Sequence, residues 1–68
     1  MPERLANNLK DRRAELGLTQ AELAERVGVT RKTVNTVENG VFTPSATLAI
    51  KLAQALNVSV EQLFWIER

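Results

Sequence analysis

The 68-residue sequence contains no cysteine, no histidine and no tyrosine. Without cysteine the chain can form no disulfide and no thiolate metal site, and nothing indicates an oxidising compartment. Without histidine it lacks the usual general base and the commonest zinc ligand. Its apolar runs are only a few residues long, too short to cross a bilayer. We therefore expect a cytoplasmic protein that is not an enzyme, with no metal, cofactor, membrane or small-molecule partner.

A strong excess of charge of either sign is also missing. The net charge is +1, from nine Lys and Arg against eight Asp and Glu, and this balance alone says nothing about nucleic acid. The distribution is more informative, because Arg31 and Lys32 are the only charged residues between Val27 and Val37. A local basic patch is typical of a DNA-contacting surface, but an Arg-Lys pair is equally ordinary on a solvated helix. Charge alone leaves both interpretations open.

The spacing of apolar residues and the capping residues predict five short helices. Leucines at helical intervals predict the first over about residues 5–16, although residues 1–5 could instead be extended. Thr19 and Glu22 form a capping box before a second helix over about 20–27, and Thr30 caps a third over about 31–39. Ser45 caps a fourth helix over about 46–56, and a second capping box at Ser59 opens a short fifth.

The second and third helices are joined by only a few residues around Gly28. Two helices that meet at a tight glycine-containing turn form a helix-turn-helix, here over about residues 20–39. Ala24 is small enough for the third helix to cross close by. The wedge between the two helices is filled by the apolar residues Leu23, Val27, Val29, Val34 and Val37. The opposite side of the third helix must then point outward.

Four residues lie on that outer side: Arg31, Lys32, Asn35 and Thr36. Arg and Lys can donate to guanine, Asn can pair with adenine, and a Thr methyl group can touch a thymine methyl. The N-termini of the second and third helices offer free N–H groups and positive dipole ends that suit phosphate oxygens. Gln20, Thr30 and Thr33 lie at those ends.

Residues 16–40, LGLTQAELAERVGVTRKTVNTVENG, resemble the helix-turn-helix of the Xre family, which includes the lambdoid phage repressors and Cro. The segment PSATLAIKLAQALNVSVEQLF is similar to the family's fourth and fifth helices, so the resemblance covers nearly the whole chain. It implies an all-α, five-helix, lambda-repressor-like fold over residues 1–68 as a single domain. The implied function is sequence-specific binding of double-stranded DNA in transcription regulation.

The resemblance also implies roles for single residues. It places Arg31, Lys32 and Thr36 at base contacts, with Asn35 added from its outward position. Phosphate contacts are expected at Gln20, Thr30, Thr33, Asn39 and Thr43. Arg13 and Glu38 match a buried ion pair that links the first helix to the third, so we interpret both as structural.

In compact members that the chain resembles, the chain ends form a small strand pair and the C-terminal region helps to build a dimer. We therefore expect a homodimeric repressor that reads a near-palindromic operator, with Phe64, Trp65 and Ile66 at the dimer interface. The N-terminal MPERLANN departs from that pattern, so an early start of the first helix stays an alternative. Phe42 could pack into the core, brace its loop near DNA or lie in a dimer contact, and of these we expect packing into the core. The alternative function is an antitoxin-like module that binds a partner toxin and autoregulates.

Overall fold

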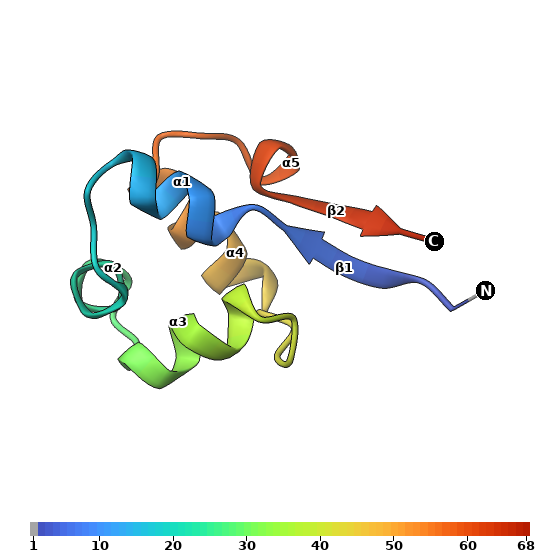
Figure 1. The fold of residues 1–68 in the computed structure, drawn as a ribbon, viewed down its shortest axis with the longest axis horizontal. Coiled ribbons are helices and arrows are strands. Elements are labelled where there is room, and N and C mark those ends of the chain that lie inside the picture. Colours follow the sequence, from blue (N-terminus) through green and yellow to red (C-terminus); the bar gives the residue numbers. More distant parts are fainter. Residues whose placement is uncertain (1) are drawn as a thin grey trace.

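The computed structural model describes residues 2–68. In chain order the elements are β1 (Arg4–Asn7), α1 (Leu9–Glu15), α2 (Gln20–Val27), α3 (Arg31–Glu38), α4 (Ala46–Ala55), α5 (Val60–Leu63) and β2 (Phe64–Glu67). Figure 1 shows the five helices gathered into one body, from which the two strands extend together. The expected five-helix fold and the strand pair at the chain ends are both confirmed. None of the helices described is long and apolar enough to cross a membrane.

The predicted start of the first helix at about residue 5 is wrong. Residues 4–7 form β1, which pairs antiparallel with β2 so that Leu5 lies opposite Ile66. Asn7 ends the strand: its Oδ1 accepts from the backbone N–H of Leu9 at 3.0 Å. Its Nδ2 donates to the carbonyl of Val37 at 3.0 Å. The bond to Val37 ties the end of the strand to α3, and the bond from Leu9 lies at the turn into helix α1, which begins at Leu9.

Capping residues set the bounds of α2 and α3 as the sequence predicts. Thr19 and Glu22 form the full capping box, and the Thr30 hydroxyl accepts from the backbone N–H of Thr33. Gly28 ends α2 with φ of +77°, in the left-handed region that glycine enters without a steric penalty. The tight turn at Gly28 lets α3 follow α2 after only a few residues, which gives the helix-turn-helix.

The core lies where the helices meet. Its fully buried side chains come from every helix: Leu9, Leu23, Leu52, Leu56, Leu63, Val34 and Val37. No polar or charged residue among those described is buried as a whole. The side of α3 that carries Val34 and Val37 is therefore fixed against the core, and its other side must face solvent.

The strand pair, which we call the ribbon (residues 3–7 and 64–68), is less covered. Phe64 is 7 % exposed and belongs to the core, whereas Trp65 and Ile66 are 42 % and 57 % exposed. Phe64 therefore does not share the exposed surface expected for a dimer interface. Exposed ion pairs, Arg4–Glu67 at 2.9 Å among them, join the two strands of the ribbon.

The expectation that Phe42 packs into the core is also wrong, because its side chain is 48 % exposed in the loop after α3.

Candidate nucleic-acid interface

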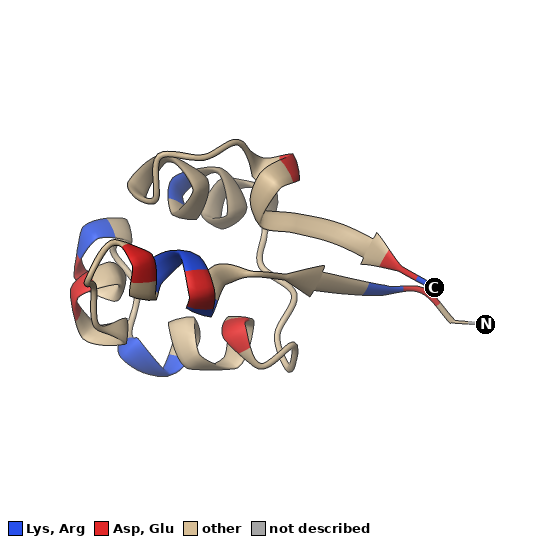
Figure 2. Cartoon of the chain, turned by 45° about the horizontal axis from the view of Figure 1, so that its top comes forward, with Lys and Arg blue, Asp and Glu red and all other residues tan. Residues whose placement is uncertain are grey.

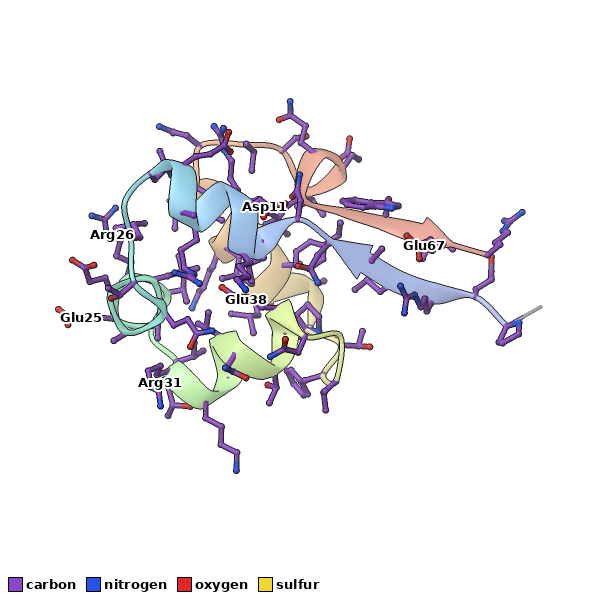
Figure 3. All side chains as sticks on the ribbon, viewed as in Figure 1. Asp11, Glu25, Arg26, Arg31, Glu38 and Glu67 are labelled. Atoms are coloured by element: carbon purple, nitrogen blue, oxygen red, sulfur yellow. The ribbon has the colours of Figure 1, made fainter. Side chains whose placement is uncertain are left out.

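The first turn of α3 carries the free positive charge of this face. Arg31 and Lys32 are both exposed, and neither forms an ion pair with any residue in the described range 2–68. Figure 2 shows this basic turn at one end of α3 and an acidic residue at the other. In Figure 3 the Arg31 side chain lies at the corner between α2 and α3, pointing away from the helical body. The pair is thus available to an anionic partner.

The threonines on this side are held by hydrogen bonds within α3 and its N-cap. The hydroxyls of Thr30 and Thr33 lie 3.1 Å apart, and the Thr30 oxygen also caps the helix. The Thr36 hydroxyl donates to the carbonyl of Thr33 at 2.9 Å. A donor used in this way cannot also donate to a base, so Thr36 presents mainly its methyl group and an acceptor.

Three amide side chains connect the start of α2 with the outer side of α3. Gln20 Nε2 donates to Glu38 at 3.0 Å, and Asn35 Nδ2 donates to Gln20 Oε1 at 3.5 Å. Asn39 Nδ2 donates to Asn35 Oδ1 at 2.9 Å and to the Asn35 carbonyl at 2.9 Å. The Gln20 amide is therefore engaged within the protein, which leaves the backbone N–H groups of the first turn of α2 to meet a phosphate.

Arg13 and Glu38 form an ion pair beneath this surface. Arg13 Nε lies 2.6 Å from Glu38 Oε2, and the side chains are 14 % and 3 % exposed. Arg13 Nη1 also donates to the carbonyl of Leu18 at 2.8 Å. The hydrogen bonds that the Arg13 guanidinium donates to Glu38 raise the pKa of Arg13 above its ordinary value, against the opposing effect of burial. Figure 3 places Glu38 inside the body, between α1 and α3. The pair joins α1 to α3 and does not face an external ligand.

Comparison with known proteins decides the family. A family model described as "Helix-turn-helix" matches residues 9–63. The chain is 43 % identical over 63 residues to the HTH-type transcriptional regulator YgzD of Bacillus subtilis, covering 93 % of this chain and 96 % of that one. The chain is a member of the helix-turn-helix family. It belongs among DNA-binding transcriptional regulators, and its binding partner is double-stranded DNA.

Two further likenesses bear on what such a domain does. The structure of SinR, described as the master regulator for biofilm formation and solved in complex with DNA, has a TM-score of 0.72 and 33 % identity. The matched region covers 78 % of this chain and 86 % of the SinR chain. The antitoxin HipB of Escherichia coli is 36 % identical over 59 residues, covering 87 % of this chain and 67 % of HipB.

The remaining predicted contacts of this helix-turn-helix protein lie beyond α3. Asn39 caps the C-terminus of α3, and Thr43 follows in the loop to α4, both exposed. They lie at the opposite end of α3 from Arg31, so the predicted contacts span the full length of the helix. The structure places all of them on or next to the helix-turn-helix, apart from the ribbon.

Sequence reasoning missed the link between Gln20 and Glu38. It assigned Gln20 to phosphate because of its place at the start of α2, and Glu38 to an ion pair with Arg13 alone. No spacing in the sequence signals that the two side chains meet, because they lie on different helices. The contact exists only once the tight turn at Gly28 packs α2 against α3.

Proposed function

We propose that this protein is a dimeric repressor that reads a near-palindromic operator, with α3 in the major groove. Arg31, Lys32, Asn35 and Thr36 contact base edges. Phosphates are contacted from the ends of α2 and α3 and from the loop after α3, through Gln20, Thr30, Thr33, Asn39 and Thr43. For Gln20 the backbone N–H makes this contact, because its side chain is engaged elsewhere.

The observation that carries the proposal is the two-sided character of α3. Val34 and Val37 are 1 % exposed and lock one side into the core, while Arg31 and Lys32 on the first turn have no partner among the described residues. The major groove of B-DNA admits an α-helix, and Arg or Lys donating to guanine is the commonest specific contact there. Thr36, whose hydroxyl is engaged, suits a thymine methyl group.

In the proposed dimer, a second copy of this chain packs against the exposed ribbon. Trp65 and Ile66 leave large apolar surface in water, and an isolated two-stranded ribbon is marginally stable by itself. Trp65 and Phe42 line one groove of about 470 Å³ between β1 and the loop after α3. A two-fold dimer would place the two α3 helices about 34–36 Å apart, on successive major grooves of one face of DNA. Repression follows when the bound dimer occupies a promoter.

The second candidate is an antitoxin-like module that binds a toxin protein and regulates its own promoter. The likeness to HipB favours it. In that case the exposed ribbon binds another protein instead of a second copy.

Selection from a random duplex pool, at one fixed near-physiological salt concentration, tests the proposal. The salt has to be fixed because phosphate contacts make the affinity steeply salt-dependent. Enrichment of an inverted repeat is the expected result. Binding that is salt-sensitive but indifferent to sequence would contradict the proposed reading of bases and favour the antitoxin-like module.

A further inference from the structure

A chain of side-chain hydrogen bonds runs from the buried ion pair to the outer side of α3. It begins at Arg13, passes through Glu38 to Gln20, and continues through Asn35 to Asn39. The Gln20–Asn35 link at 3.5 Å is the longest, and the others of the amide series are 2.9–3.0 Å. The series connects the two helices of the helix-turn-helix at the point where α3 presents its middle turn.

The order of donors and acceptors in this series is fixed at its buried end. An ionised carboxylate only accepts hydrogen bonds, so Gln20 has to turn its amide nitrogen toward Glu38. The Gln20 oxygen then faces α3, where it can only receive a donor, and Asn35 turns its nitrogen toward it. Asn35 in turn directs its oxygen at the amide of Asn39.

We propose that Gln20 is a positioning residue that acts through Asn35 to set the base preferred at one position of each half-site. This inference rests on the proposed function, since it requires that α3 reads bases. Gln20 itself makes no base contact. Its effect is to hold the Asn35 amide in one of its two orientations.

In its fixed orientation, the Asn35 side-chain amide matches adenine better than guanine. Asn35 retains one N–H and one oxygen lone pair beyond those used by Gln20 and Asn39. Adenine offers an acceptor at N7 and a donor at N6, which satisfy both. Guanine offers acceptors at N7 and O6, so one of them would face the Asn35 oxygen. The fixed orientation therefore favours adenine opposite Asn35.

The first test uses the free protein. Gln20→Met keeps the length and packing of the side chain but removes both hydrogen bonds, and Gln54→Met, on the exposed surface of α4, is the matched control. In two-dimensional ¹H–¹⁵N NMR spectra the Asn35 side-chain amide resonances should shift in Gln20→Met and stay in place in Gln54→Met. Unshifted resonances in a folded Gln20→Met protein would overturn the inference.

The second test uses the selected operator. Gln20→Met should reduce the preference for adenine at one position per half-site by about tenfold and leave the other positions within about twofold. Asn35→Ala should remove the same preference, and adding Gln20→Met to it should change that position no further, because the two residues act as one unit. A uniform loss of affinity at every position would assign Gln20 to phosphate binding and overturn the inference.

Different results would contradict the proposed reading of bases by α3 and the proposed role of Gln20. If the wild-type protein enriches no sequence, the proposed reading of bases is wrong and the role of Gln20 is wrong with it. If the wild-type protein enriches an operator and Gln20→Met enriches the same one with the same preferences, only the role of Gln20 is wrong.

Discussion

The α2–α3 unit and the ribbon distribute polar and apolar side chains in opposite ways. In the α2–α3 unit the apolar residues are inside, at Val34 and Val37, and the charged pair that is buried links α3 to α1. In the ribbon the ion pairs are exposed and the apolar side chains of Trp65 and Ile66 meet water. The first unit is complete within one chain and offers a polar surface. The second leaves the apolar side chains of Trp65 and Ile66 partly exposed to solvent.

The largest expected effect is a loss of stability when the ion pair of the α2–α3 unit is broken, compared with breaking one in the ribbon. Glu38→Ala leaves Arg13 without its partner at a buried position, and we expect it to lower the free energy of unfolding by about 3–5 kcal/mol. Glu67→Ala removes the exposed partner of Arg4 and should cost less than about 1 kcal/mol. Thermal unfolding followed by circular dichroism measures both. Equal losses of unfolding free energy in the two variants would show that the buried ion pair stabilises the fold no more than the exposed one.

Next comes the apolar surface of the ribbon. Trp65→Ala should weaken dimerisation by about 2–4 kcal/mol, as expected when a central Trp anchor of an interface is truncated. The monomer should stay folded, because the ring is 42 % exposed within one chain. Sedimentation across a concentration series measures the dimer. Ile50→Ala, on the exposed surface of α4, is the control, and a larger effect there would place the interface on α4.

An arginine in each region provides the third contrast. Arg31→Ala should cost on the order of 1–3 kcal/mol of operator binding and relax the preference at one base pair per half-site. Arg4→Ala in the ribbon should leave every base preference unchanged. Selection from the same random pool gives both profiles. An unaltered profile for Arg31→Ala would remove Arg31 from the base-reading residues.

The smallest effect compares the two capping boxes. Hydrogen bonds from Thr19 lower the pKa of Glu22 below its ordinary value, whereas the box before α5 uses the uncharged Gln62. A carboxyl whose pKa is lowered by folding adds stability above its unfolded pKa and loses it as the pH falls through its folded pKa. Glu22→Gln should therefore keep the cap but flatten the decline in melting temperature between about pH 6 and 3. An identical decline in both proteins would contradict this.

Local signals in the sequence predict most of the helix-turn-helix. The caps at Thr19 and Thr30 and the glycine at 28 act within a few residues, so the bounds of α2 and α3 follow from them. The apolar spacing then settles which side of α3 is buried. The family resemblance adds the Arg13–Glu38 pair, which the structure contains.

Features that depend on distant partners could not be predicted in this way. Leu5 and Leu9 are spaced as on a helix, yet Leu5 lies in a strand because its partner, Ile66, comes from the other end of the chain. Phe42 looks like a core residue by composition, but the helices already fill the core without it. The order of the Gln20 and Asn35 amides depends on how α2 packs on α3, which no single stretch of sequence contains.

The pairing of β1 with β2 also has a consequence for how the domain is made. β1 is the first of these segments to be synthesised and β2 the last, so the ribbon cannot form until translation has passed Glu67. Bringing the two strands together costs the loop-closure entropy of nearly the whole chain, and the contacts of the ribbon have to offset that cost. The helices, built from nearby residues, can assemble before the ribbon does. A nascent chain halted before Phe64 would therefore expose Leu5 and a core that still lacks the Phe64 side chain.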